Sequence, residues 1–286
     1  MDKILVTGAT GQLGSAMVGA LVGKGKHVRA ATRKTTKIRW TDMVQPVAFD
    51  FEDAGLHKAA LDGMSGLFLV APPLDFEAPA KLIPFIDKAK QMRVEHIVFI
   101  SAFGMDANAQ APLRIIERYL MNSGLAYTIL RPNFFMENFS TGFVAPMIAG
   151  GRIYMAAGDG KTSFISVSDI AEAAATAFEK KHYGAEYNLT GPEALSYGQV
   201  AEIISALCGR TVTYHPISET EMAKGARDKG MPESAIRYLA DLFSAVRNGL
   251  MATITDGVRK VIERDAVSFS EFAQMSTAFC KQSKAA

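Results

Sequence analysis

The opening of the chain contains three closely spaced glycines within the run Gly8-Ala9-Thr10-Gly11-Gln12-Leu13-Gly14. A short apolar run at residues 3–7 precedes it, and apolar residues at helical spacing follow over residues 12–22. A glycine turn between a strand and a helix lets the backbone approach a pyrophosphate, and the helix N-terminus binds the anion. The sequence therefore predicts a dinucleotide site at Gly8, Thr10, Gly11, Gln12, Leu13 and Gly14, with an ordinary glycine-rich turn as the alternative.

Basic residues follow the second predicted strand, residues 27–32. Arg33, Lys34 and Lys37 lie where an NAD-binding protein carries an acid for the adenosine 2′-OH, and no acid occurs between this strand and Asp42. A guanidinium binds phosphate through paired donors. We therefore predict NADP(H) as the preferred cofactor, with Arg33 and Lys37 at its 2′-phosphate, and NAD(H) as the alternative. A solvated basic loop is the other interpretation of these residues.

The expected site continues along the carboxyl ends of further predicted strands. Asp50 and Phe51 end the strand at residues 45–51, where they could supply a carboxylate for the adenine amine and an apolar neighbour for its ring, or form a turn. Three more strands are expected over residues 67–70, 96–101 and 126–130. The cofactor contacts expected at their ends are Ala71, Pro72, Pro73, Ser101, Phe103, Pro132, Asn133 and Phe134.

These strands are short, apolar and separated by helical patterns over residues 12–22, 76–92 and 112–123. Apolar strands alternating with helices indicate an α/β fold with a Rossmann-type, doubly wound parallel sheet that is buried on both faces. The 76–92 helix contains Pro84, where we expect a bend.

The alternation loosens after Arg131. Capping boxes that begin at Ser196, Ser218 and Ser268 predict three later helices. We therefore expect an NAD(P)-binding domain over residues 1–150 and a smaller α/β C-terminal substrate lobe over residues 151–286, with the chain crossing between them.

The composition favours one or two globular domains. The 286 residues are 49% hydrophobic with a net charge of +2, which excludes a disordered chain and gives no support for a nucleic-acid partner. Cys208 and Cys280 show no metal-ligand spacing and favour a reducing compartment. No apolar window approaches the ~18 residues of a membrane span. We expect a cytoplasmic protein with no metal and no membrane partner.

An aromatic run follows the sixth predicted strand. Phe135, Phe139 and Phe143 recur at four-residue intervals, which on a helix would put them near one face. This face either packs on the sheet as core or, together with Phe103 and Met136, forms a flat pocket for a planar acceptor.

Five runs along the chain carry a family pattern. They are the glycine run, Arg131-Pro132-Asn133-Phe134-Phe135-Met136-Glu137-Asn138, Ser166-Val167-Ser168-Asp169-Ile170-Ala171, Tyr187-Asn188-Leu189-Thr190-Gly191 and Ser268-Phe269-Ser270-Glu271-Phe272-Ala273. The chain resembles, over essentially its whole length, the NmrA-like branch of the atypical short-chain dehydrogenases/reductases. It looks most like NAD(P)H-dependent reductases of quinones, azo dyes and triphenylmethane dyes. The resemblance implies a Rossmann-type fold with the nicotinamide near the Pro-Asn-Phe turn.

The Tyr-x-x-x-Lys pair of the wider superfamily is absent, since Tyr119 is followed four residues later by Ser123 and Tyr127 by Arg131. Carbonyl–alcohol interconversion, which needs a proton on oxygen, is therefore disfavoured. So is an isoflavone-reductase-like or sugar-nucleotide activity. We predict an oxidoreductase that transfers hydride from NADPH to a quinone-like or azo-dye-like aromatic acceptor, with no catalytic residue assigned. The alternative is a non-catalytic, NADP(H)-binding redox sensor of the NmrA type with a protein partner, and a homodimer is compatible with both.

Overall fold

The computed structural model describes residues 3–37, 41–276 and 279 of the chain. They form two compact units. The first consists of Met1–Pro132, Val167–Leu189 and Gly257–Arg264, and the second of Asn133–Ser166, Thr190–Asp256 and Asp265–Ala286. The chain therefore first passes from one unit to the other after Pro132, whereas the predicted domain boundary was near residue 150.

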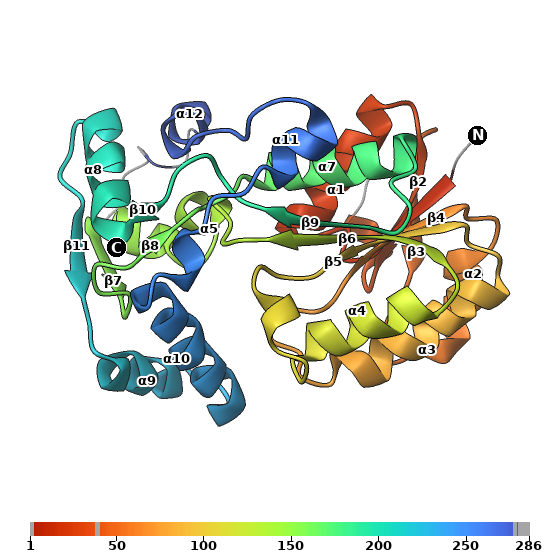
Figure 1. Ribbon diagram of the computed structural model, residues 1–286, viewed down its shortest axis with the longest axis horizontal. Helices are drawn as coiled ribbons and strands as arrows, with labels where there is room; N and C mark the ends of the chain where they lie inside the picture. Colours follow the sequence, from red (N-terminus) through yellow and green to blue (C-terminus); the bar gives the residue numbers. More distant parts are fainter. Residues whose placement is uncertain (1–2, 38–40, 277–278, 280–286) are drawn as a thin grey trace. The chain divides into compact units, whose positions relative to one another are not determined.

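A seven-stranded parallel sheet forms the centre of the first unit (Figure 1). Its strands are β1 (Lys3–Val6), β2 (His27–Thr32), β3 (Val44–Ala48), β4 (Gly66–Val70), β5 (His96–Ile100), β6 (Ala126–Pro132) and β9 (Ala185–Leu189). Their order is β3-β2-β1-β4-β5-β6-β9, and every pairing is parallel. This is the predicted doubly wound Rossmann-type sheet. The chain order reverses between β1 and β4, which is where such sheets bind ligands.

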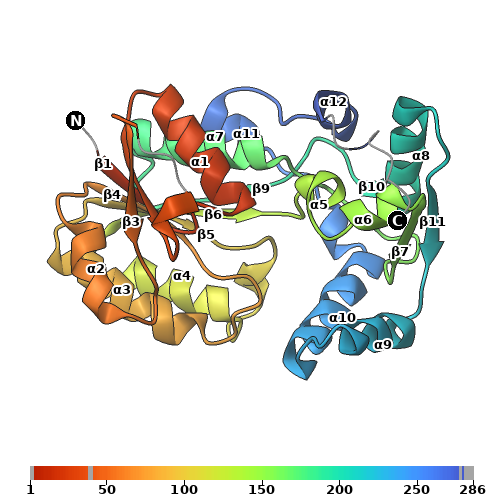
Figure 2. The ribbon, with the colours of Figure 1, turned by 180° about the vertical axis from the view of Figure 1, so that it is seen from behind.

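Helices cover both faces of this sheet (Figures 1 and 2). One face carries α1 (Gln12–Gly23), α7 (Val167–Glu179) and α11 (Gly257–Ile262), and the other carries α2 (Ala54–Leu61), α3 (Ala78–Gln91) and α4 (Pro112–Asn122). Short 3-10 turns lie at η1 (Thr35–Lys37) and η2 (Met105–Ala107). The helix α2 was not predicted from the sequence, although Asp53 caps it by accepting the backbone N–H of Gly55 at 2.9 Å.

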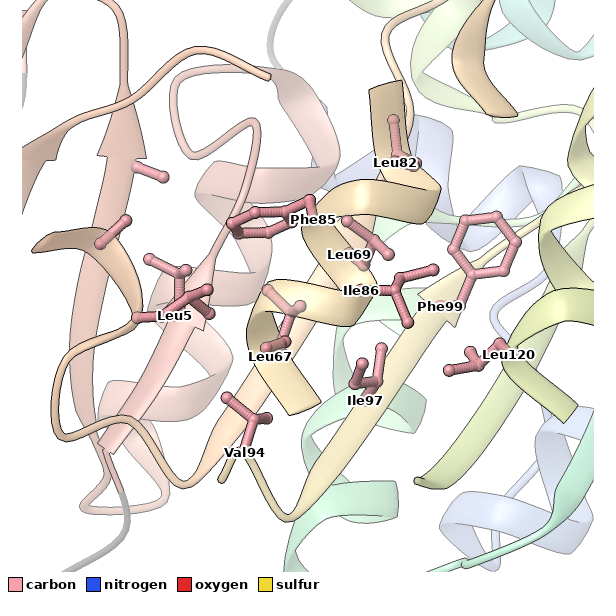
Figure 3. Close-up of a cluster of buried hydrophobic side chains, with 14 of the residues drawn as sticks. Leu5, Leu67, Leu69, Leu82, Phe85, Ile86, Val94, Ile97, Phe99 and Leu120 are labelled. Carbon is pink, nitrogen blue, oxygen red and sulfur yellow. The ribbon is translucent and has the colours of Figure 1, made fainter. Parts of the chain in front are cut away.

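The core between the sheet and α3 and α4 explains the apolar strands (Figure 3). Leu67, Leu69, Ile97 and Phe99 alternate along β4 and β5 and pack with Phe85 of α3, and all five are fully buried. Burial of one such side chain contributes roughly 1.5–3 kcal/mol. This core fixes the strand ends that carry the predicted site. The helix α3 continues through Pro84.

The second unit contains two small sheets and short helices. β7 (Arg152–Met155) pairs with β11 (Thr213–Pro216), and β8 (Lys161–Thr162) pairs with β10 (Leu195–Ser196). Its helices are α5 (Glu137–Ser140), α6 (Ala145–Ala149), α8 (Tyr197–Cys208), α9 (Glu219–Asp228), α10 (Glu233–Arg247), η3 (Leu250–Ala252) and α12 (Phe269–Met275). The capping boxes predicted at Ser196, Ser218 and Ser268 are confirmed, each at the start of a helix.

Helix length and the state of the cysteines can be compared with the expectations from composition. No helix in the described part of the chain is long and apolar enough to cross a bilayer. Cys208 is not a free thiol, which does not fit the reducing compartment predicted from the two cysteines, and Cys280 lies outside the described residues.

A buried histidine at the start of β5 makes the stability of the first unit depend on pH. His96 bonds the hydroxyl of Thr128 at 2.9 Å through Nε2, and that hydroxyl donates to the carbonyl of His182 at 2.7 Å. Thr128 must therefore accept from His96, so Nε2 of the ring carries a proton. Burial lowers the pKa of His96 to about 4, with a smaller contribution from His182.

We expect this histidine to cost stability in acid. The unfolded chain takes up the proton near pH 6.5 and the folded chain only near pH 4. His96 therefore leaves the free energy of unfolding unchanged above pH 6.5 and lowers it by about 3 kcal/mol as the pH drops from 6.5 to 4. Chemical denaturation at pH 7, 5.5 and 4 measures the loss, which should be smaller by that amount in His96→Gln. Equal losses in the two proteins would contradict this assignment.

Candidate functional site

The glycine turn after β1 depends on a left-handed backbone at Gly8 and on the close approach of Gly14 and Gly11 to the Gly8 carbonyl oxygen. Gly8 has a φ of +62°, which favours glycine. A Cβ on Gly14 would lie 2.1 Å from the carbonyl oxygen of Gly8, so no side chain fits at that position. The N–H of Gly11 donates to the same Gly8 oxygen at 2.9 Å. The turn is therefore wound tightly against the first turn of α1.

The N-terminus of α1 lies directly after this turn. Gly11 is its N-cap and provides no side-chain hydrogen bond, and the first turn contains no acidic residue. Thr10, Gly11 and Gln12 are exposed, whereas Leu13 and Gly14 are buried. A helix end of this kind presents backbone N–H groups and the positive end of its dipole to an anion.

Hydrogen bonds hold the end of β4 against the turn. The Thr7 hydroxyl donates to the carbonyl of Phe68 at 3.1 Å and accepts the N–H of Val70 at 2.9 Å. A Cβ on Gly8 would lie 2.9 Å from Cγ1 of Val70. The segment that follows, the predicted contacts Ala71, Pro72 and Pro73, therefore leaves the sheet beside the turn. Ala71 is half-buried and the two prolines are exposed.

A hollow of about 390 Å³ lies at the ends of β2 and β3. It is lined by Arg33, Ala48, Phe49, Asp50, Glu52, Asp53 and Leu56. Thus the structure brings together two residues that were predicted separately, the exposed cation Arg33 and the carboxylate Asp50. Asp50 also forms the turn given as its alternative role, because its Oδ1 accepts the N–H of Glu52 at 3.1 Å. The Arg33 guanidinium suits the phosphate of a phosphorylated ribose, and the Asp50 carboxylate suits the amine of an adjacent adenine.

Two other predicted residues at this end have different surroundings. The Phe51 ring packs edge-on against Phe49, with ring centroids 4.9 Å apart, and belongs to the margin of the core. Lys37 is the last residue of η1, four positions after Arg33 in the chain, and its contact with the 2′-phosphate stays a prediction.

The ends of β5 and β6 are held in register beyond the strands. The N–H of Ser101 donates to the carbonyl of Leu130 at 2.8 Å, and that of Phe103 to the carbonyl of Pro132 at 3.0 Å. Ser101 and Pro132 are buried, and Phe103 is half-buried. The three residues therefore lie at the carboxyl edge of the sheet, and their contact with the cofactor stays a prediction.

A buried ion-pair network supports this edge and was missed by the sequence analysis. Arg131 of β6 donates to both carboxylate oxygens of Glu117 on α4, each at 2.8 Å, and also pairs with Glu186 of β9. Arg114 donates to Glu117 at 2.7 Å. Burial alone would raise the pKa of the Glu117 carboxyl, but hydrogen bonds from Arg131 and Arg114 hold that pKa below its usual value. The available signal was a charged residue within an apolar strand.

Asn133 and Phe134 begin the second unit, where Asn133 has a structural role. Its Nδ2 donates to the Ser163 hydroxyl at 2.8 Å and to the carbonyl of Met251 at 2.9 Å, and its Oδ1 accepts the N–H of Phe134. Asn133 is 3% exposed. These bonds already use most of the amide, and the predicted contact of both residues with the cofactor stays a prediction.

The expectation that Phe135, Phe139 and Phe143 form an aromatic stripe along one face of a helix was wrong. The chain turns between α5 and α6 at Gly142, where a Cβ would lie 2.6 Å from Cα of Asn138, so no continuous helix carries the stripe. Phe139 is 1% exposed in an aromatic cluster with Phe164, and Phe143 is 53% exposed.

The same burial decides which stripe residues remain candidates for the acceptor pocket. Met136 is fully buried, so Met136 and Phe139 are core residues of the second unit rather than lining for an acceptor. Phe135 is half-buried and stays a predicted contact, as does the exposed Phe143.

The first unit has the features that a dinucleotide requires. Neither Gly8 nor Gly14 has room for a Cβ, the helix end beside them has no side-chain cap and no acidic residue in its first turn, and a hollow containing Arg33 and Asp50 lies at the ends of β2 and β3. The residues present therefore fit a nicotinamide dinucleotide. No group of three His, Cys, Asp or Glu side chains within the described residues could hold a metal. The fold and this turn define a dinucleotide-binding α/β protein.

The chain belongs to the NmrA-like family, whose model matches residues 1–273. It is 33% identical to Prestalk A differentiation protein A of Dictyostelium discoideum, over 95% of this chain and 91% of the relative. It is also 33% identical to the NAD(P)H azoreductase of Xenophilus azovorans, over 96% of this chain and 98% of the relative.

A solved structure shows the same fold. The NADPH-dependent quinone oxidoreductase QOR2 of Escherichia coli, complexed with NADPH, superimposes with a TM-score of 0.82. It is 26% identical, and the match covers 96% of this chain and 98% of QOR2.

Proposed function

We propose that this protein is an NADPH-dependent reductase that transfers hydride to a quinone-like or azo-dye-like aromatic acceptor. The observation that carries the proposal is the Gly14 approach to the Gly8 carbonyl at the switch point of a parallel sheet. The azoreductase and quinone-oxidoreductase names of two similar proteins support the same reaction class.

Three groups in the first unit would each hold one part of the cofactor. The Gly8–Gly14 turn and the N-terminus of α1 would bind the pyrophosphate, Arg33 the 2′-phosphate and Asp50 the adenine amine. When bound, the reduced nicotinamide supplies a hydride to the acceptor. A quinone that receives a hydride and one proton from water becomes a hydroquinone, so electrons and protons balance without a protein acid.

This reaction does not require the proton-delivery pair that the sequence lacks. No Tyr-x-x-x-Lys pair occurs in the chain. An acceptor whose reduced form takes its proton from water needs no such pair, and the chain would act by positioning the acceptor within about 3–3.5 Å of the hydride.

The proposal is tested by following NADPH absorbance with a panel of quinones and azo dyes. We expect oxidation of one NADPH for each quinone reduced, with no added flavin. If NADPH binds but none of the acceptors is reduced, the proposed reaction is wrong.

A redox sensor is the second candidate function. The missing proton-delivery pair favours it, and so does a 33% identical relative named for differentiation rather than for a reaction. A sensor would bind NADPH and NADP⁺ with unequal affinity and capture a protein partner in only one of these states. Turnover with the acceptor panel would decide against it.

Arg33 should discriminate between the two nicotinamide cofactors. We expect Arg33→Ala to weaken NADPH binding by about 10- to 150-fold and NADH binding little, because a charged hydrogen bond contributes ~1.5–3 kcal/mol. Calorimetric titration of each cofactor measures both losses, and Arg33→Lys, which keeps charge but not the paired donors, should fall between. Equal losses for NADPH and NADH would refute the 2′-phosphate assignment.

A further inference from the structure

The loop at residues 71–77, which joins β4 to α3, has an unusual backbone. Pro72 and Pro73 restrict its first half. Leu74 then has a φ of +56°, a conformation that is costly for a residue with a branched side chain. Its side chain is nevertheless 43% exposed, so burial of Leu74 in a core does not explain why leucine occupies a left-handed position.

A polar clamp fixes the second half of the loop. The Asp75 carboxylate accepts the N–H of Glu77 at 3.0 Å through Oδ1 and pairs with Lys81 at 2.9 Å through Oδ2. Lys81 also pairs with Glu52 at 2.9 Å, and Glu52 lines the hollow beside Arg33. The clamp therefore connects this loop to the wall of the proposed cofactor site and holds Leu74 in place.

The loop begins where the glycine turn meets the sheet. Its first residue follows Val70, whose N–H is bound by Thr7 and whose Cγ1 faces Gly8. The segment Ala71-Pro72-Pro73-Leu74 contains no charged residue, and Phe76, which is 36% exposed, adds aromatic surface. A rigid, uncharged surface at the carboxyl edge of β4 suits a flat apolar molecule better than a phosphate or a charged peptide.

We propose that Leu74 is a specificity-determining residue that contacts the planar aromatic acceptor. This inference rests on the proposed function, whose acceptor it places on the 71–77 loop. The left-handed backbone at Leu74 leaves its isobutyl group exposed at the loop surface, and the two prolines and the Asp75–Lys81 pair restrict the loop to one conformation.

The test measures acceptor binding separately from turnover. Menadione, a planar naphthoquinone, is titrated by calorimetry or NMR into the protein saturated with NADP⁺, a state in which no hydride is available. Leu74→Gly removes the side chain and suits a positive φ, and Leu74→Asn keeps a side chain that tolerates this φ but makes it polar. We expect both variants to bind menadione about 5- to 10-fold more weakly, with an unchanged Kd for NADP⁺.

Arg93→Gly is the matched control. Arg93 has a φ of +61° and lies before β5, at the opposite end of the strands from the 71–77 loop. Its replacement relieves the same kind of strain, so Leu74→Gly and Arg93→Gly should change the melting temperature similarly, while only the Leu74 variants lose menadione affinity.

Unchanged menadione affinity in both Leu74 variants, or no menadione binding by the unmodified protein, would overturn the inference. The NADPH oxidation assay with the unmodified protein tests the proposed function independently of this inference. Menadione binding that depends on Leu74 but leads to no turnover would support the contact and refute the reaction.

Discussion

Replacement of Arg131 by methionine should lower the free energy of unfolding by about 3–5 kcal/mol. The change leaves the fully buried carboxylate of Glu117 with Arg114 as its remaining cationic partner, and the loss of one member of a buried ion pair has this magnitude. Urea denaturation at neutral pH measures the effect. Removing both charges in Arg131→Met/Glu117→Leu should recover part of the loss, because no buried carboxylate then remains at that position.

A surface ion pair provides the matched comparison. Lys24 pairs with Glu179 at 2.6 Å, and both side chains are partly exposed to solvent. Lys24→Met should therefore cost less than about 1 kcal/mol. If Arg131→Met cost no more than this surface variant, the Arg131–Glu117 pair would not be what stabilises the edge of the sheet at β6.

Gly14→Ala should abolish most cofactor affinity. The new Cβ would lie 2.1 Å from the Gly8 carbonyl oxygen, so the turn must open and its N–H groups must move away from the proposed pyrophosphate position. We expect NADPH to bind at least about 100-fold more weakly, which corresponds to ~2.7 kcal/mol. Calorimetric or fluorescence titration of NADPH measures this loss.

Gly19→Ala in the same helix is the control for this variant. A Cβ at Gly19 meets no atom within 4 Å, so alanine should leave NADPH affinity unchanged and stabilise α1 by roughly 0.5–1 kcal/mol. A Gly14→Ala variant that bound NADPH as well as Gly19→Ala would show that the turn is not the cofactor site.

The sequence predicted the sheet well because its strands are apolar on both faces. The predictions for β2 and for the start of β5 agree with the structure to the residue, and β3 was placed too far along the chain because Phe49 and Phe51 extend its apolar pattern. The eight-residue α2 was missed, although Asp53 offered an N-cap signal.

Contacts between distant segments were beyond sequence reasoning. The partners of Arg131 lie on α4 and β9, and only the tertiary fold shows that they meet it. The aromatic stripe was misjudged for a related reason, because periodicity alone did not reveal that the chain turns at Gly142 and buries Phe139. The tight turn at Gly8 and Gly14 was predictable because its constraint lies within a few positions of sequence, whereas its role in cofactor binding stays a prediction.

The most direct measurement is a crystal structure of the protein with NADPH bound. We expect the pyrophosphate to lie on the Gly8–Gly14 turn at the N-terminus of α1, and the 2′-phosphate to lie within hydrogen-bond distance of the Arg33 guanidinium. A dinucleotide bound elsewhere, or a vacant glycine turn at saturating NADPH, would contradict the account.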